Sequence, residues 1–568
     1  MSLARHLGRL ATLAAVPACV GAQQPAAAAG RELPRAHAPK PTSAAITEQD
    51  LMTRLYIFAD DSMQGRATGT DGYRKGTDYI AAELGRLGLQ PAGENGTYFQ
   101  ALPSRTIAAA TRLAVGDAGL ALWTDFVPLV GSGAPRAYEG AGVVFGGDLA
   151  AYAANATTPP PLTAAQVAGK VVAVRAAAGA PTSARALGAL ARGPLADAAA
   201  IAVLLAEPLS APALAQARRA SMGGTTEGEV PYVLLVAPSA APRLLGADPA
   251  TLQAGATGPT LRGAIALERG GDGTARNVVA VYPGSDPRLK GQYVALGAHA
   301  DHVGFSTRPV DHDSLKAFNA RSWQLRGANN DPKPLTPDLR AQVSVNVDSL
   351  RRLRPARPDS ISNGADDDGS GSMALLEIAE AFANGAPKPK RSVLFVWHVG
   401  EELGMLGSAY YSDHPTVPRD SIVAQINIDM IGRGGAADLA NGGPGYVGVV
   451  GSRRLSRQLG DLVEEVSRSR GYNLKFDYGL DANGHPQNIY CRSDHRSYAR
   501  YGIPIAFFFT GLHGDYHQVT DEPQYIDYAN YTRLTSYIRD LTLAIAERPT
   551  GFTLDAPKPT DPNAPCRQ

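Results

Sequence analysis

The chain of 568 residues has little cysteine and no excess of charge of either sign. Its 54 lysines and arginines are balanced by 53 aspartates and glutamates, which leaves a net charge of +1. A basic excess is typical of nucleic-acid-binding proteins, so we expect no nucleic-acid partner. Of the three cysteines, Cys491 and Cys566 lie far from the N-terminus, and both a disulfide between them and two free thiols remain open.

Beyond its N-terminus, the chain lacks internal repeats and any hydrophobic run long enough to cross a bilayer. The N-terminus carries Arg5 and Arg9, an apolar run over 10–20 and then small residues, which is typical of a secretory signal. Two processing patterns compete, cleavage after Ala22 and a lipobox with lipidation at Cys19. The sequence therefore predicts an exported protein, secreted, periplasmic or lipid-anchored, that meets a membrane only through such an anchor.

Composition changes along the chain and predicts where its parts begin and end. The region after 125 has short β-rich runs without any cluster of His, Asp, Glu or Cys, so we expect a separate, non-catalytic domain there. The predicted parts are a signal peptide over 1–22, an Ala/Pro-rich linker over 23–45, the N-terminal part of the catalytic domain over 46–124, the β-rich insert over 125–265, the rest of the catalytic domain over 266–548 and a disordered tail over 549–568.

From residue 277 onward, apolar strands alternate with amphipathic helices. Strands that are apolar on both faces indicate an α/β fold, with a mostly parallel mixed sheet sandwiched by helices. In such sheets, ligand-binding groups gather at the carboxyl ends of the strands.

Acidic and imidazole side chains follow these strands at five places. The five stretches are GAHAD with His299 and Asp301, GADDDGSG with Asp366, Asp367 and Asp368, VGEELG with Glu401 and Glu402, INIDM with Asp429, and GLHGDYHQVTDE with His513, His517 and Asp521. Each alone has a structural explanation: a surface histidine, a solvated turn, acids at a helix N-terminus. Together they would converge on one sheet edge, where buried acids need positive charge.

Mixed nitrogen and oxygen ligands without thiolates suit zinc in a hydrolytic site, and a shared carboxylate suits two metals about 3.5–4 Å apart. Two rival sites fail. A calcium loop needs acids at alternate positions and a Glu six residues after the glycine, whereas here the acids are consecutive and Leu375 follows Gly369 at that spacing. A nucleophilic serine lacks a G-x-S-x-G motif with suitable partners.

The motifs GAHAD, NGADDDGSG, VWHVGEELGMLGS, INIDMIGR and GLHGDYHQVTD occur in this order and resemble the co-catalytic dizinc exopeptidases, the family of bacterial leucyl-type aminopeptidases and glutamate carboxypeptidase II. The 125–265 region resembles the protease-associated domain inserted in some members. The resemblance implies the zinc exopeptidase fold, two Zn²⁺ per chain and peptide substrates. It also implies five ligands: His299 and Asp429 on one zinc, Glu402 and His517 on the other, and Asp367 bridging both.

The same resemblance implies three further roles. Glu401 would be the general base, taking a proton from the dizinc-bound water as it attacks the scissile carbonyl and passing it to the leaving amine. Asp301 would orient the His299 imidazole. Tyr516 would stabilise the oxyanion. It further implies a cis peptide bond after Asp367, while Asp366 and Asp368 would hydrogen-bond neighbouring groups instead of binding metal.

The chain departs from this family in two places. The last motif reads TDE where relatives usually show Asp-Thr, which puts no metal ligand in doubt. The larger departure is a long segment over 303–363 between the first two motifs. Long irregular loops are often lids or binding elements, so we hypothesise that this one borders the active site and limits substrate size. The leading function is an aminopeptidase. A glutamate-type carboxypeptidase is the alternative, with Arg433, Arg492 or Arg496 available for the substrate carboxylate. A glutaminyl cyclase with one zinc and a non-catalytic receptor-like module rank lower, and no motif indicates the oligomeric state.

Overall fold

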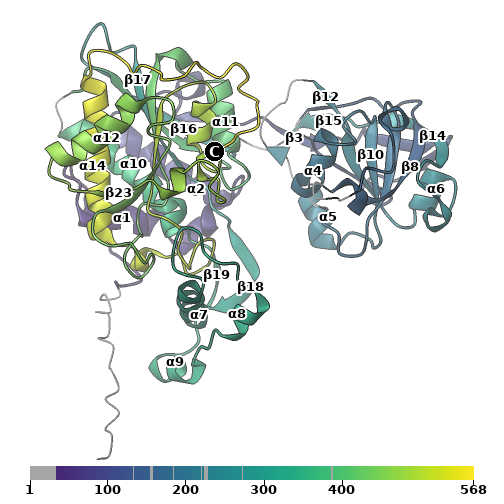
Figure 1. Ribbon diagram of the computed structural model, residues 1–568, viewed down its shortest axis with the longest axis horizontal. Coiled ribbons are helices and arrows are strands. Elements are labelled where there is room, and N and C mark those ends of the chain that lie inside the picture. The colour runs from purple at the N-terminus through teal and green to yellow at the C-terminus, as the bar shows by residue number, and fades with distance from the viewer. Residues whose placement is uncertain are drawn as a thin grey trace, which may run out of the picture.

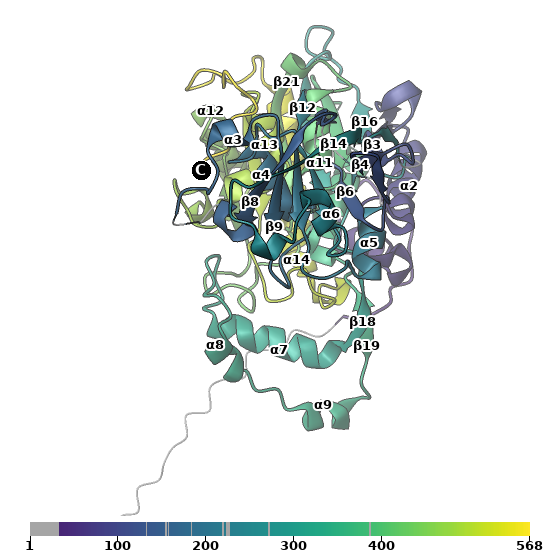
Figure 2. The ribbon, with the colours of Figure 1, turned by 90° about the vertical axis from the view of Figure 1, so that its right-hand side faces the viewer.

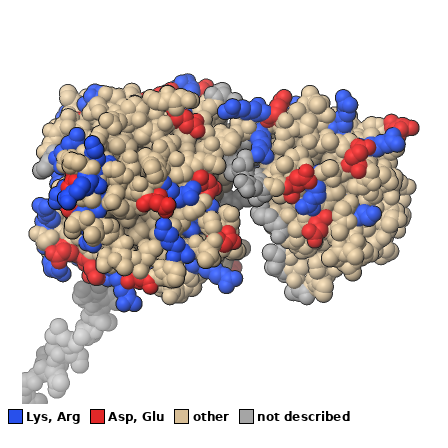
Figure 3. Space-filling model, turned by 90° about the horizontal axis from the view of Figure 1, so that it is seen from above, with Lys and Arg blue, Asp and Glu red and all other residues tan. Residues whose placement is uncertain are grey.

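A computed structural model describes residues 33–568 apart from 132, 154, 155, 157, 183, 219, 220, 223–227, 271, 272, 386 and 387. The predicted signal peptide, with Cys19, lies outside the described residues. Among those that are described, no helix has the length and apolar character needed to span a membrane. On the face shown in Figure 3, acidic and basic side chains are interspersed, in keeping with the balanced composition.

A nine-stranded mixed sheet forms the centre of the catalytic region. Its four inner strands pair in parallel, whereas the pairs that flank them on either side are antiparallel. In spatial order the strands are β1 (Gln90–Pro91), β16 (Arg276–Tyr282), β20 (Ser392–His398), β17 (Tyr293–His299), β21 (Ile422–Ile428), β24 (Ile505–Phe509), β22 (Tyr446–Val450) and β23 (Lys475–Asp477), and β2 (Phe99–Ala101) also pairs with β16. The inner strands are buried on both faces, as their apolar sequences predict.

Helices cover both faces of this sheet (Figure 1). One face packs against α1 (Glu48–Phe58), α2 (Asp71–Arg86), α10 (Gly371–Asn384), α12 (Arg457–Ser469) and α14 (Tyr528–Glu547). The other face packs against α11 (Leu406–Asp413) and α13 (His495–Ala499), through the buried rings of Tyr411 and Tyr498. The α/β class and the mixed sheet sandwiched by helices are therefore confirmed.

A buried ionic network holds three of these helices together. Arg54 of α1 is fully buried and donates from Nε to Glu377 Oε2 of α10 at 2.7 Å and from Nη1 to Glu83 Oε2 of α2 at 3.0 Å. It also contacts the carboxylate of Glu380. One guanidinium thus neutralises acids from two neighbouring helices.

Arg54→Met is expected to destabilise the protein by about 3–5 kcal/mol, because it leaves Glu377 buried without its cation and Glu380 paired only with the partly exposed Arg86. Arg74→Met is the matched control, since Arg74 of α2 is 43% exposed and its pairs with Asp71 and Asp78 are worth about 1 kcal/mol or less. Thermal unfolding measures both variants. Equal melting temperatures for the two would contradict the role given to Arg54.

A second sheet, of eight strands, is formed by the chain between Arg112 and Ala264 (Figure 2). It begins with two short strands ahead of residue 125, where the β-rich insert was expected to start. In spatial order the strands are β5 (Ala118–Leu120), β4 (Arg112–Val115), β14 (Thr257–Ala264), β8 (Gly142–Asp148), β9 (Val171–Arg175), β10 (Ala200–Leu204), β13 (Tyr232–Val236) and β6 (Phe126–Leu129). Each face has its own apolar cluster. That it is a protease-associated domain stays a prediction.

The 303–363 insertion is not an irregular loop. Its ends pair as the antiparallel strands β18 (Phe305–Asp311) and β19 (Pro358–Ile361). Between them lie α7 (His312–Leu325), α8 (Pro337–Ala341) and α9 (Val347–Leu353). Figures 1 and 2 show this unit projecting below the main sheet.

The C-terminal tail also differs from expectation. Cys491 and Cys566 form a disulfide, the pairing that the sequence left open. The last residue, Gln568, accepts hydrogen bonds from the backbone N–H groups of Tyr490 and Gly484, both at 3.0 Å. The prediction of a disordered tail over 549–568 is therefore wrong, because a covalent link and specific hydrogen bonds hold this polar, proline-rich segment against the catalytic region.

Candidate metal centre

The parallel strands deliver acidic and imidazole side chains to one edge of the main sheet. His299 is the last residue of β17, and Asp429 directly follows β21. Glu401 and Glu402 lie three and four residues beyond the end of β20. Asp367 and His517 come from the turn before α10 and the loop after β24. The structure thus brings together all five side chains that the resemblance implies as ligands.

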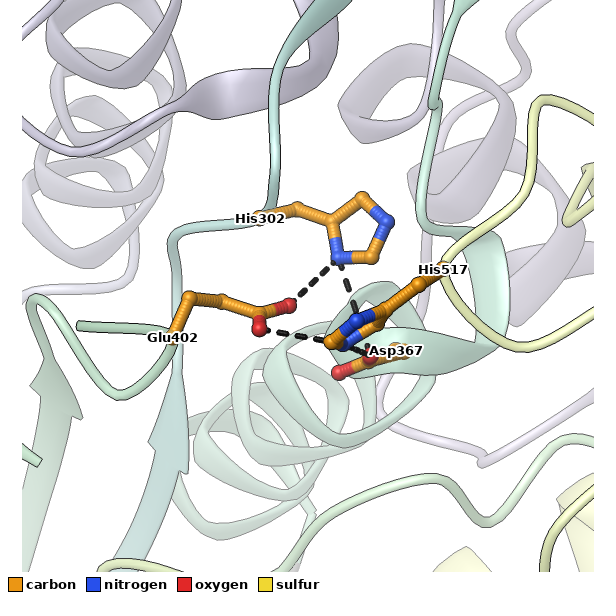
Figure 4. Close-up of side chains that lie close together, drawn as sticks. All are labelled: His302, Asp367, Glu402 and His517. Atoms are coloured by element: carbon orange, nitrogen blue, oxygen red, sulfur yellow. Dashed lines mark hydrogen bonds and ion pairs between the residues drawn. The ribbon is translucent and has the colours of Figure 1, made fainter. Parts of the chain in front are cut away.

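Asp367 lies between two groups of donor atoms. Its Oδ1 is 3.2 Å from His299 Nε2, which is itself 3.6 Å from Asp429 Oδ1. Its Oδ2 is 3.0 Å from His517 Nε2, and the same nitrogen is 3.0 Å from Glu402 Oε2 (Figure 4). The two oxygens of the Asp367 carboxylate therefore face two different sets of donor atoms.

These residues fit bound cations. Asp367 Oδ2 and His517 Nε2 are buried atoms without a hydrogen-bond partner among the described residues. Burial lowers the pKa of His517, but contact with the carboxylates of Asp367 and Glu402 raises it to about 10. Excess negative charge of this kind attracts either a proton or a metal ion. A nitrogen and oxygen donor set without sulfur suits zinc.

The aspartates on either side of Asp367 bind protein groups. Asp368 Oδ2 accepts the N–H of His299 at 3.0 Å, and its Oδ1 accepts the N–H groups of Gly371 and Met430 at 2.8 and 3.2 Å. Asp366 Oδ1 accepts the N–H of Gly432 at 2.7 Å. The Asp367–Asp368 peptide bond is cis. Asp368 lies near His299 and Asp429, but its oxygens already serve the backbone.

Asp301 contacts His299 differently from the expectation. The ring atom Nδ1 of His299 is 3.0 Å from the backbone oxygen of Asp301 and 3.8 Å from its carboxylate. The carboxylate instead accepts the backbone N–H of Glu401 at 3.2 Å and the hydroxyl of Thr68 at 2.8 Å. The carbonyl thus orients the imidazole, while the side chain positions the segment that carries Glu401.

Sequence reasoning missed His302. Its Nδ1 is 2.9 Å from Glu402 Oε1 and 3.7 Å from Asp367 Oδ2, so it belongs to the same group of donors as His517. His302 is fully buried and positions the Glu402 carboxylate. The signal was present in the sequence, since His302 directly follows Asp301 in GAHADH. His513, by contrast, contacts Asp366 Oδ2 at 3.3 Å.

A cleft of about 410 Å³ opens onto this centre and includes the other two predicted site residues, Glu401 and Tyr516. Burial raises the pKa of Glu401 well above its ordinary value. Tyr516 stacks on the His517 ring with centroids 3.9 Å apart, and burial raises its pKa. The cleft is also lined by the apolar side chains of Met430, Ile489, Phe507 and Phe509.

A third group of donors lies at the base of the insertion. His312 Nδ1 is 2.8 Å from Asp359 Oδ2 and 3.7 Å from Glu522 Oε1, and its Nε2 is 3.3 Å from the Tyr525 hydroxyl. Both ring nitrogens thus have partners within the protein. We interpret this group as a link between the insertion and the segment after His517.

Solved structures and curated proteins with similar chains include several aminopeptidases. The aminopeptidase from Aneurinibacillus sp. strain AM-1 superposes with a TM-score of 0.43 and 15% identity, over 90% of this chain and 96% of that one. Leupeptin-inactivating enzyme 1 of Streptomyces exfoliatus is 30% identical over 169 residues, 29% of this chain and 33% of that protein. An aminopeptidase of Pseudomonas aeruginosa is 32% identical over 204 residues, 32% of this chain and 35% of that protein.

The matched part of this chain spans about a third of the length of those two curated relatives. A family model matches more of it: residues 277–542 match "Peptidase family M28". The match includes all five side chains that the resemblance implies as ligands, together with Glu401 and Tyr516. It confirms the resemblance to zinc exopeptidases, because this part of the chain, slightly less than half of its length, matches peptidase family M28.

Proposed function

We propose that this protein is an exported, zinc-dependent aminopeptidase that removes residues from the N-termini of peptides. The observation that carries the proposal is the position of Asp367, with one carboxylate oxygen toward His299 and the other toward His517. Relatives named as aminopeptidases support the activity. Export rests on the N-terminal sequence pattern alone.

Two zinc ions would be held at this site, one by His299 and Asp429, the other by Glu402 and His517, with Asp367 shared. Zinc bound there would act as a Lewis acid on the scissile carbonyl and would lower the pKa of a water molecule. Two sets of donors favour two ions over the single zinc of a glutaminyl cyclase. The intact ligand sets also favour an enzyme over a receptor-like module.

The protein's own groups would then move the protons. Glu401, at the cleft, takes a proton from the attacking water and delivers it to the leaving amine. The contact between the Glu401 N–H and Asp301 fixes the backbone beneath this carboxylate. Tyr516 lines the same cleft, and its hydroxyl, kept protonated by its raised pKa, donates to the oxyanion.

A carboxypeptidase remains the second candidate, because one of the three arginines considered for it lies at the cleft. Arg492 is exposed and lines the cleft, where it can meet a substrate carboxylate. Arg433 is buried and bound to Asp438 and Asp515, at 3.2 and 3.3 Å. The apolar wall that includes Met430 and Phe507 favours an apolar side chain in the cleaved residue.

Mass spectrometry of peptide products separates the two activities. Free peptides are expected to lose N-terminal residues, N-acetylated peptides are expected to resist, chelation is expected to stop the reaction, and added zinc is expected to restore it. Loss of C-terminal residues from blocked peptides, without N-terminal trimming of free ones, would overturn the aminopeptidase proposal in favour of the carboxypeptidase.

A further inference from the structure

A second cavity, of about 720 Å³, lies between the insertion and the loop that carries His517. Helix α7 contributes Leu315, Phe318 and Trp323 to its wall, and the loop contributes Leu512 and Tyr516. Leu512 and Tyr516 also line the cleft at the metal centre. The cleft and this cavity therefore adjoin each other at Leu512 and Tyr516.

The insertion is firmly joined to this loop. Asn319 of α7 donates to Thr520 Oγ1 at 3.0 Å and to Asp515 Oδ1 at 3.4 Å. Lys316 of the same helix forms an ion pair with Asp515. Asn330 accepts the backbone N–H of Leu512 at 3.2 Å. The cavity is thus a built feature of the active-site surroundings.

Two arginines line the cavity above aromatic rings. The guanidinium carbon of Arg326 lies 5.5 Å from the centre of the Trp323 ring, and that of Arg340 lies 5.1 Å from the centre of the Phe318 ring. In the part of the chain that the structure describes, neither forms an ion pair with a carboxylate. Such guanidiniums bind carboxylates through paired hydrogen bonds.

One acidic residue, Asp311, also lines the cavity, but it is already neutralised. Its carboxylate forms an ion pair with Arg351 and accepts a hydrogen bond from the Ser314 hydroxyl. The remaining charge of the lining is positive. Half-buried apolar side chains such as Leu335 and Val345 complete it.

We propose that this cavity binds the part of a peptide substrate downstream of the scissile bond and selects peptides that carry a carboxylate there, next to apolar side chains. The inference rests on the proposed aminopeptidase function. The carboxylate is either an acidic side chain or the C-terminus of a short peptide. The insertion then extends the substrate-binding site. This gives a more specific form to the hypothesis that the insertion limits substrate size.

The test compares kcat/KM for four substrates: leucine p-nitroanilide, which is too short to reach the cavity, Leu-Ala-Ala-Ala, its C-terminal amide, and Leu-Ala-Glu-Ala amide. The free acid and the Glu-containing amide are expected to exceed the plain amide by about tenfold. A gain for only one of them identifies the source of the carboxylate. The double variant Arg326→Gln/Arg340→Gln is expected to remove the gain and to leave leucine p-nitroanilide unchanged.

Arg321→Gln is the matched control, because Arg321 lies on α7 and is exposed outside the cavity lining. This control variant is expected to keep the higher kcat/KM of the carboxylate-bearing peptides over the plain amide. Equal kcat/KM for all three peptides, or a gain that survives the double variant, would overturn the subsite. If none of the four substrates loses its N-terminal leucine, the proposed function fails. Calorimetric binding of the same peptides then decides the subsite, with tighter binding of the carboxylate peptides supporting it and equal binding overturning it.

Discussion

Asp367→Ala is expected to remove both zinc ions and to lower hydrolysis by more than about 100-fold. The reason is that its two oxygens face different donor sets, 3.2 Å from His299 Nε2 and 3.0 Å from His517 Nε2. His517→Ala, by contrast, is expected to weaken one ion preferentially. Zinc per chain, measured by atomic emission after gel filtration, gives the comparison.

Asp461→Ala serves as the control for Asp367, since Asp461 is 70% exposed on α12 and is expected to leave the zinc content unchanged. A variant of Asp367 that loses a single ion and keeps the other at wild-type affinity would show that this carboxylate does not serve both sets.

Glu401→Gln is expected to lower kcat by about 10²–10⁴-fold while zinc stays bound. Gln keeps the shape of the side chain but has no carboxylate to take the proton. Its neighbour provides a sharp contrast. Glu402 Oε2 lies 3.0 Å from His517 Nε2, so Glu402→Gln is expected to lose zinc as well as activity. Stopped-time product assays and zinc content, measured on the same preparations, separate the two effects.

Glu465→Gln is the exposed control on α12, expected to match the wild type in both measurements. Near-normal turnover by Glu401→Gln would remove Glu401 as the base. Loss of zinc from that variant would make it a ligand instead.

The main sheet and the ligand positions could be predicted from the sequence because both depend on local patterns. Continuously apolar strands such as β17 and β20 have one plausible environment, a sheet covered on both faces. Once they are parallel, the residues that follow them must meet at one edge. The local pattern alone does not show which of the three consecutive aspartates binds metal. The family resemblance was needed to select Asp367. The hydrogen bonds of Asp366 and Asp368 to backbone N–H groups now give a physical reason.

What the sequence did not predict depends on tertiary contacts. His302 directly follows Asp301 in the first motif, but the sequence does not show its contact with Glu402, which the fold places 2.9 Å away. The tail over 549–568 has a disordered composition, and its disulfide to Cys491 and the hydrogen bonds of Gln568 hold it in place. The family resemblance implied that the Asp301 side chain orients His299. The chain turn instead presents the carbonyl to the ring and the carboxylate to Glu401.

The most direct test of the two-metal account is a crystal structure with anomalous diffraction recorded at the zinc absorption edge. The account predicts two peaks, one beside His299 and Asp429 and the other beside Glu402 and His517, with Asp367 in contact with both. A single peak at this edge of the sheet, or zinc only at the group around His312, would contradict it.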